Sequence, residues 1–399
     1  MMAATATTTD RPTADRPRGG LVALCIAVTT SWGLLYYSLP VALAPIAADT
    51  GWSHTAITGA FSAGLIVSAV AGIRVGRILD ARGPRRVMTA GALLGVLALA
   101  LVAWAPTLPM FFAAWLLAGI AQSAVLYPPA FAVITRWYGP HRVRPLTTLT
   151  LIAGLASTIF APLTAWLIDY LGWRTSYLVL AGILAALTLP LHALFLNRTW
   201  SDAPSAQPAS DAADDIRSVT RTPRFITLQI TMALATLAFF AVTINLIPLL
   251  LERGMDYATA ALALGLVGAG QVIGRLGYAA LDRTTTPRVR TMAILGAGAA
   301  GLWALALLPG PAWLLITVAV LVGAARGCHT LLQATAVSDR WGTTHFAAIN
   351  AVFTAPMTAV GALAPVAGPA LASLLGSYPA MAVTMALVLT AVVLLAVRS

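Results

Sequence analysis

The chain has 399 residues, of which 59% are hydrophobic and only 9% are charged, and its mean hydropathy is +0.86. Soluble domains carry about 25% charged residues, so this composition excludes an ordinary soluble protein and indicates a polytopic membrane protein. The net charge is +11, because 24 arginines outnumber 13 acidic residues, and the chain has no lysine. The only cysteines, Cys25 and Cys328, lie inside apolar stretches and offer no disulfide framework or metal cluster.

Taken in chain order, residues 1–19 are a polar tail, and twelve apolar stretches follow it. Each stretch is long enough, at about 1.5 Å per residue, to cross a hydrocarbon layer of about 30 Å as a helix. The first is too long for a cleaved signal and is expected to be retained. The stretches are 20–47, 54–79, 86–105, 108–137, 145–170, 174–196, 225–251, 257–281, 289–309, 311–340, 344–371 and 378–397.

A polar segment divides these predicted helices into two sets of six. Residues 198–224 are rich in Pro, Ala, Ser and Asp, and such a composition buries too little apolar surface to fold alone. The sequence therefore predicts an N-terminal bundle over 20–197, a cytoplasmic linker over 198–224, and a C-terminal bundle over 225–399.

The arginines are concentrated in the N-terminal tail and in alternate connections, whereas the other connections hold little beyond Arg174 and Arg253. This is the positive-inside pattern, so we expect both termini to be cytoplasmic, in the cell membrane. It also makes nucleic-acid binding an unnecessary explanation of the charge. The clustered residues are Arg11, Arg16, Arg18, Arg82, Arg85, Arg86, Arg142, Arg144, Arg217, Arg221, Arg224, Arg283, Arg288, Arg290 and Arg340.

The two halves resemble each other in sequence. GIRVGRILDARGPRR (72–86) and IGRLGYAALDRTTTPRVR (273–290) each have an Arg, a Gly two residues later, and an Asp at the predicted cytoplasmic mouth. When Arg136 is aligned with Arg340, Gln122 stands opposite Arg326. Repeated halves of a transporter place the substrate between them, near the bilayer midplane.

The segment GRILDARGPRR resembles the signature GxxxDRxGxR of the major facilitator superfamily, and LDR at 281–283 resembles its degenerate second copy. With GWR at 172–174 and the six-plus-six arrangement, the resemblance covers essentially the whole chain. It implies an all-α fold of two pseudo-symmetric six-helix bundles and a transporter that works by alternating access, as a monomer.

The residues of this signature are expected to control opening of the cytoplasmic side. Gly76 lets neighbouring helices approach, and Asp80 is placed to accept from arginines and to cap a helix N-terminus. The remaining gating candidates are arginines that would hold the loop at the anionic leaflet and the acid–base pair of the second copy, namely Arg82, Arg85, Arg86, Asp282 and Arg283.

Arginines without carboxylates characterise the membrane interior. All thirteen acidic residues fall at predicted span ends, in loops or in the tail, whereas Arg275 and Arg326 lie deep in predicted helices. Such residues usually face a partner or a water-filled cavity. A guanidinium binds a carboxylate bidentately and stays charged, so we expect a small organic anion as substrate.

Other polar and aromatic residues complete the candidate site. Gln271 lies one turn before Arg275 on the same face, while Tyr36, Tyr127 and Asn245 could border or contact the substrate, although packing alone would explain them. His329 is the deep side chain best suited to carry a proton, or it is a neutral histidine bonded to a backbone carbonyl. Pro128 and Pro129 should break the fourth helix, and glycines beside the arginines, such as Gly274, Gly323 and Gly327, are expected to loosen the bundle.

Several of these features are similar to the monocarboxylate and oxalate/formate transporter branch: Gln271 before Arg275, Tyr-Pro at 127–128 followed by RWYGPHR, and GWSHTAITGAFS opening the second helix. The resemblance implies that Arg275 binds the substrate carboxylate. The branch often has an acidic residue where this chain has Gln271, so His329 or the substrate itself would carry any coupled proton.

Two other functions remain open. Proton-coupled drug or metabolite efflux is the alternative within the superfamily, but the first helix lacks an acid and GLASTIFAPL in the fifth matches the efflux motif poorly. A membrane sensor or enzyme is not supported, because the sequence has no nucleophile–base pair, metal cluster or phosphate loop. We therefore expect no catalytic or metal-binding residues and no cofactor.

Overall fold

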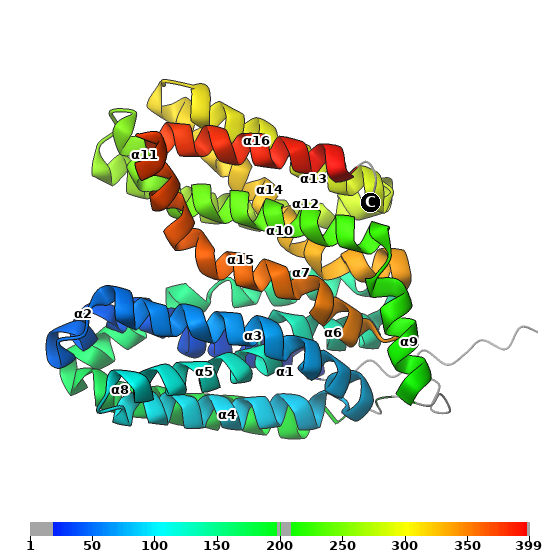
Figure 1. Ribbon diagram of the computed structural model, residues 1–399. Coiled ribbons are helices and arrows are strands. Elements are labelled where there is room, and N and C mark those ends of the chain that lie inside the picture. The colour runs from blue at the N-terminus through cyan, green and yellow to red at the C-terminus, as the bar shows by residue number, and fades with distance from the viewer. Residues whose placement is uncertain (1–18, 198–199, 201–208, 397–399) are drawn as a thin grey trace, which may run out of the picture.

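A computed structural model describes residues 19–197, 200 and 209–396, and this part of the chain is built from helices joined by short connections (Figure 1). The N-terminal half consists of α1 (Gly20–Trp32), the π-helix η1 (Gly33–Tyr37), α2 (Ser38–Thr50), α3 (His54–Arg82), α4 (Pro84–Trp104), α5 (Leu108–Val125), α6 (Tyr127–Tyr138), the 3-10 helix η2 (Gly139–His141), α7 (Val143–Ala153) and α8 (Ala156–Phe195). The C-terminal half consists of α10 (Pro223–Ile244), α11 (Leu246–Glu252), α12 (Tyr257–Thr284), α13 (Pro287–Leu307), α14 (Ala312–Trp341), α15 (Phe346–Leu375) and α16 (Tyr378–Ala396).

The described residues contain eleven helical runs that are long and apolar enough to cross a membrane. One of them, Val143–Phe195, has 53 residues and turns at Gly172, whose φ of 71° and ψ of 163° interrupt the helix. An L-residue with a side chain rarely adopts this conformation, so glycine at this position of GWR permits the reversal. The run therefore makes two crossings, and the prediction of twelve transmembrane helices is confirmed.

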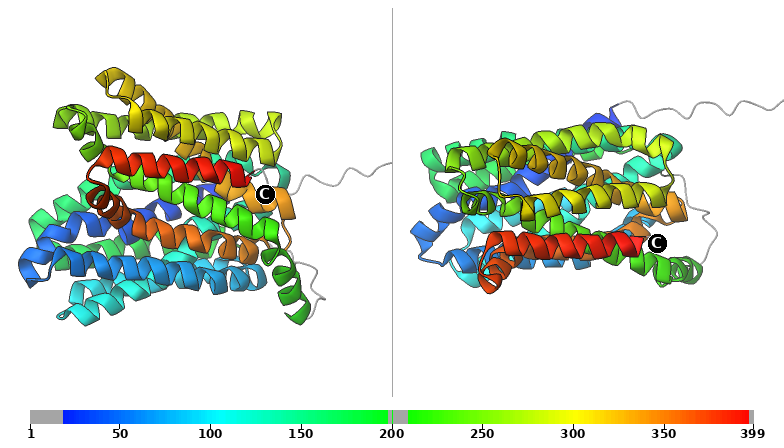
Figure 2. Two further views of the ribbon diagram at one scale, coloured as in Figure 1. Left: turned by 45° about the horizontal axis from the view of Figure 1, so that its top comes forward. Right: turned by 90° about the horizontal axis from the view of Figure 1, so that it is seen from above.

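The two halves have the same internal packing. In the N-terminal half α4 packs on α8 and α3 on α5, and in the C-terminal half α13 packs on α16 and α12 on α14. Figure 1 shows the halves as two layers, with α3 and α15 adjacent where they meet, and Figure 2 shows the bundle from two further directions. The fold is the predicted pair of pseudo-symmetric bundles.

Four transmembrane helices are interrupted in the described structure, and one of these breaks lies at Gly154 and Leu155, between α7 and α8. Leu126 is extended between α5 and α6, so the predicted break beside Pro128 and Pro129 is confirmed. The first helix contains the π-helix at Gly33–Tyr37, and the seventh breaks at Asn245, between α10 and α11. A π-helical turn widens the backbone by one residue and is frequent at functional sites.

One helix lies within the predicted linker 198–224, of which residues 198–199 and 201–208 lie outside the described part of the chain. It is α9 (Ala209–Thr220), and it packs on α15 and α10. Ile216 provides a buried apolar contact, with 7% of its surface exposed. Figure 1 shows α9 at the same end of the bundle as the C-terminal end of α16.

Candidate functional site

The candidate site is positioned by close backbone packing between α12 and α14. A methyl group at Gly270 or Gly274 would overlap the main chain of α14 near Val320 and Ala324. In the same way, a methyl group at Gly323 or Gly327 would overlap the main chain of α12. The expectation that these glycines loosen the bundle is wrong, because they bring two helix backbones into contact. The contact holds the flanking arginines, Arg275 and Arg326, at fixed positions.

Arg275 reaches from α12 to the opposite half. Its Nη1 donates to the carbonyl oxygen of Thr150 on α7 at 2.9 Å, and its side chain is buried, with 8% of the residue exposed. Its Nε is also buried and has no hydrogen-bond partner among the described residues. One donor of the guanidinium thus joins the two halves, while at least one other remains available.

Arg326 of α14 is half-buried, and its guanidinium packs on an aromatic ring. The guanidinium carbon sits 4.1 Å from the centroid of the Phe240 ring, which belongs to α10. Stacking of this kind uses the face of the guanidinium plane and leaves the N–H groups at its edge free to bind an anion. Within the described part of the chain, the Arg326 guanidinium has no hydrogen-bond acceptor or ion-pair partner.

The electrostatic surroundings of these two arginines contain no compensating carboxylate among the described residues. Arg326 interacts with the positive charge of Arg275 and with the hydroxyl groups of Tyr36 and Tyr37. Tyr37 also interacts with Arg275, as does Tyr127. The structure therefore brings Arg275, Arg326, Tyr36 and Tyr127 into one neighbourhood, and it adds Tyr37.

Aromatic rings of the N-terminal half form a wall on the other side of this neighbourhood. Trp32 is the centre of the wall, with ring centroids 5.0 Å from Tyr36, 6.3 Å from Tyr37 and 5.1 Å from Tyr127. Tyr36 and Tyr37 are consecutive residues at the end of η1, and the wider π-helical turn is what brings two successive tyrosines to the same site.

The π-helix is held in place by Gln122. This residue of α5 is 1% exposed, and its Nε2 donates to the carbonyl oxygen of Leu35 at 2.8 Å. Gln122 is the residue that the internal repeat aligns with Arg326. The same position therefore supports the aromatic wall in one half and supplies a cation in the other.

The remaining predicted ligands lie in different surroundings. Gln271 is half-buried on the Arg275 face of α12, and its backbone contacts Gly327. Asn245 lies at the α10–α11 break, where its amide donates to the carbonyl of Ala241 at 2.8 Å and faces Gly368. This bond uses Asn245 to close a helix end, and no contact links it to the arginine pair in the described structure.

His329 follows Arg326 by three residues and is buried. Its side chain packs against α10. Its ring centroid is 5.3 Å from that of Phe239, and its Nε2 has no hydrogen-bond partner among the described residues. The alternative interpretation, a neutral histidine bonded to a backbone carbonyl, stays a prediction. The role of His329 as a proton carrier stays a prediction.

Asp80 joins the halves at the end of the bundle that carries α9. Its carboxylate accepts from the backbone N–H of Ala347 at 3.3 Å and of Ala348 at 2.7 Å, at the N-terminus of α15, and Arg136 lies 4.0 Å away. A carboxylate at this position satisfies unpaired N–H groups and interacts favourably with the helix dipole. One turn earlier, Gly76 permits contact between α3 and α15, because a methyl group there would overlap Ala347 and Ala351.

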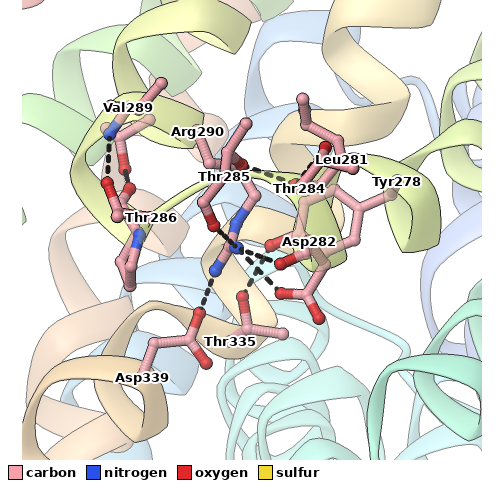
Figure 3. Close-up of polar contacts among 12 residues, drawn as sticks. Tyr278, Leu281, Asp282, Thr284, Thr285, Thr286, Val289, Arg290, Thr335 and Asp339 are labelled. Atoms are coloured by element: carbon pink, nitrogen blue, oxygen red, sulfur yellow. Dashed lines mark hydrogen bonds and ion pairs between the residues drawn. The ribbon is translucent and has the colours of Figure 1, made fainter.

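The second copy of the signature is arranged differently (Figure 3). Asp282 pairs with Arg290 of the same half at 2.8 Å instead of capping a helix of the opposite half. Arg290 lies between Asp282 and Asp339 and bonds both. Asp339 in turn pairs with Arg142, which precedes α7 in the N-terminal half. Asp339 therefore makes the connection between the halves that the repeat would assign to Asp282.

The other predicted gating residues are exposed. Arg82, Arg85, Arg86 and Arg283 lie on the surface at this end and form no ion pair with another described residue. Sequence reasoning missed Asp339, Arg142 and Arg290 as members of the gate. The available signal was the position of Asp339 immediately before Arg340 and Trp341, the pair on which the two halves were aligned.

Several contacts join the two halves. Asp80 binds α15, Arg142 binds Asp339 and Arg275 binds Thr150, while α3 and α6 pack on α15 and α7 packs on α12 and α14. The ion pairs and helix-cap bonds lie at the α9 end of the bundle, and the Arg275 bond lies at the level of the candidate site. The structure is thus closed at this end, with the arginine pair above the closure.

Comparisons with known proteins agree with the fold and with the predicted family. The model of the Major Facilitator Superfamily matches residues 22–355. The chain is similar to Monocarboxylate transporter 11 of Homo sapiens, with 29% identity over 77% of the chain and 66% of the relative, and so spans slightly less than two thirds of that protein. The resemblance to the monocarboxylate branch is confirmed.

Two further similarities are informative. Multidrug resistance protein MdtL of Klebsiella pneumoniae is 27% identical over 57% of each chain. The solved structure of the transporter FucP in the outward conformation superposes with a TM-score of 0.69 at 16% identity, over 94% of this chain and 97% of that one. At this identity the superposition supports the fold alone.

Proposed function

The chain belongs to the Major Facilitator Superfamily and is a membrane transporter, not an enzyme, and we propose that it moves a small monocarboxylate anion across the cell membrane. The observation that carries this proposal is the arginine pair. Among the described residues, the buried Nε of Arg275 has no partner, the guanidinium of Arg326 packs on the Phe240 ring, and no carboxylate neutralises either charge. An anionic substrate would supply the missing charge.

In this proposal each side chain has a distinct role. Arg275 binds the substrate carboxylate through the donors that Thr150 does not use. Tyr36 and Tyr127 border the substrate and donate hydrogen bonds to it, and Gln271 orients Arg275 from one turn away. Trp32 also offers a donor, because its buried Nε1 has no partner among the described residues.

Transport would follow from rocking of the two halves around this site. The end closed by Asp80, Asp339 and Arg142 would be the cytoplasmic end, as the arginine distribution predicts, with both termini on that side. A monomer contains all the parts that this mechanism needs. His329 is the candidate for carrying a coupled proton, and exchange of anions is the alternative.

Uptake into proteoliposomes tests the proposal. Labelled lactate, pyruvate and oxalate would be supplied with and without a pH gradient, to the unmodified protein and to Arg275→Ala and Arg326→Ala. Loss of one partner of a buried charge pair costs about 2 kcal/mol or more, so we expect each variant to reduce uptake about 30-fold. Arg74→Ala is the matched control, since it removes an exposed arginine from α3. Normal anion uptake by both variants would refute the proposal.

Drug efflux is the second candidate, because of the similarity to Multidrug resistance protein MdtL. Cationic compounds are disfavoured by a site with two arginines and no described carboxylate. The same proteoliposomes, loaded with a cationic dye, separate the two functions. Dye efflux driven by a proton gradient, in a protein that takes up none of the three anions, would establish the alternative.

A further inference from the structure

We propose that Trp200 of the linker is a positioning residue for alternating access, because it holds Asp80 and Arg136 in the arrangement that closes the α9 end of the bundle. The inference goes beyond the proposed function, since it concerns the closure and holds for any transported substrate. It gives the linker a part in setting how readily this end opens.

Trp200 is half-buried against the loop that follows α3. Its Nε1 donates to the carbonyl oxygen of Asp80 at 2.9 Å. Gly83 lies beside it, and a methyl group there would be 3.2 Å from both Cβ and Cγ of Trp200. Gly83 also has a φ of 76°, a conformation that residues with a side chain rarely adopt. The last glycine of GRILDARGPRR therefore makes room for Trp200.

The ring of Trp200 also holds an arginine of α6. The guanidinium carbon of Arg136 lies 4.4 Å from the centroid of the ring, and its Nη1 lies 4.0 Å from Oδ1 of Asp80. A cation over the face of an indole is attracted by the ring, so Trp200 restricts where the guanidinium can lie. Trp200 thus contacts both members of this pair.

These contacts bear on closure because Asp80 binds the opposite half. Its carboxylate accepts from the N–H groups of Ala347 and Ala348 at the start of α15. A bond across a boundary orders the side chains and loops that make it, and this ordering opposes the bond unless they are already held. Trp200 holds the backbone of Asp80, so closure requires less ordering. The other described part of the linker, α9, packs on α15 itself.

The second half of the chain shows which contact the linker replaces. Arg290 donates to the carbonyl oxygen of Asp282 at 3.4 Å and pairs with its carboxylate at 2.8 Å. Arg290 is the third residue after the proline that begins α13, and the third residue after the proline that begins α4 is Val87. A valine side chain has no donor for Asp80. Trp200 therefore provides from the linker a hydrogen bond that the second half makes with its own residue.

Hydrogen exchange at the amides of Ala347 and Ala348 tests the inference. These N–H groups lie in the first turn of α15 and have no acceptor within their own helix, so their protection depends on Asp80. Mass spectrometry with residue resolution would compare the full chain in lipid nanodiscs with two variants. Trp200→Phe keeps a ring and loses the donor, and Trp200→Ala loses both.

The chain offers two matched controls. Trp303→Phe removes an indole donor that bonds Thr390 at 3.0 Å, within the C-terminal half. The amide of Tyr378 is an internal reference in every variant, because it donates to the carboxylate of Glu252 at 2.9 Å, also within that half. A general loss of stability would accelerate exchange at Tyr378 as well, whereas a loss of closure would not.

We expect exchange at Ala347 and Ala348 to be about fivefold faster in Trp200→Phe, through loss of one neutral hydrogen bond. It should be about 15-fold faster in Trp200→Ala, which also loses the ring against Arg136. Exchange at Tyr378 should be unchanged. In an Asp80→Ala background, Trp200→Phe should change the rates less than about twofold, because the bond that Trp200 positions is already absent.

Three results would overturn the inference. The first is equal exchange at Ala347 and Ala348 in Trp200→Phe and Trp303→Phe. The second is an equal acceleration at Tyr378, and the third is an undiminished effect of Trp200→Phe in the Asp80→Ala background. Trp200→Phe decides the test if Trp200→Ala fails to fold. No substrate is used in these measurements, so absence of carboxylate uptake, which would refute the proposed function, is a separate result.

Discussion

Replacement of Asp80 should open the end of the bundle that is closed in this structure. The carboxylate accepts from the N–H groups of Ala347 and Ala348 at 3.3 and 2.7 Å, across the boundary between the halves. Loss of a helix N-cap costs about 0.5–2 kcal/mol, and loss of a negative charge at a helix N-terminus costs about 0.3–1 kcal/mol. Arg136, at 4.0 Å, adds little.

Together these terms give about 1–3 kcal/mol for Asp80→Ala, and the middle of this range shifts the equilibrium toward the open form about 30-fold. Asp80→Asn keeps an acceptor oxygen and loses only the charge, so its effect should be about two- to fivefold. We expect the larger shift in Asp80→Ala, because the backbone donors at Ala347 and Ala348 remain in both variants and only asparagine still offers them an acceptor oxygen.

Thiol accessibility measures the shift. Ser123 is 5% exposed and borders, with Ala347 and Ala351, a small gap between the halves. Ser123→Cys, in a protein with both native cysteines replaced by alanine, would be labelled from the closed end by a membrane-impermeant reagent.

Asp49→Ala is the matched control, because Asp49 pairs with Arg174 of its own half at 2.6 Å, outside the contacts that join the halves. Labelling no faster in Asp80→Ala than in Asp49→Ala would refute the reasoning.

Two further predictions concern the supports of the site. Gly274→Ala should lower the free energy of unfolding in detergent by about 1–3 kcal/mol, because the methyl group would overlap Ala324. Gly277→Ala, where nothing lies within 4 Å, should be neutral or stabilising, and equal melting temperatures would contradict the packing argument. Gln122→Met should raise the KM for the transported anion about tenfold through loss of the Leu35 bond, with Gln333→Met as a control at a half-buried amide, since Gln333 bonds Thr236. An unchanged KM in Gln122→Met would contradict the role of the π-helix.

Hydrophobicity and the positions of glycine and proline were sufficient to predict the fold. The apolar stretches set the twelve crossings, and Pro128 and Pro129 marked a real helix break, since both properties act locally along the chain. The π-helix at Gly33–Tyr37 could not be predicted in this way. It depends on a hydrogen bond from Gln122, which is 87 residues from Leu35 in the sequence.

The candidate site, like the fold, could be predicted from the sequence only in part. The depth of Arg275 and Arg326 followed from counting residues along helices, and the absence of mid-span acids was visible in the sequence. Whether the glycines beside these arginines loosened or tightened the bundle depended on what faced them on the neighbouring helix. The partner of Arg275, a carbonyl group on α7, carries no signal in residue identity at all.

The use of main-chain atoms as bonding partners affects which substitutions the protein tolerates. Asp80 and Arg275 each contact main-chain atoms of the opposite half, so the side chains at 150, 347 and 348 take no part in those two bonds. A substitution of similar size at these three buried positions leaves both bonds in place, whereas proline at 347 or 348 would remove the N–H donor. Mutational risk is therefore concentrated on Asp80 and Arg275, and on Arg142 and Asp339, whose bond needs both side chains.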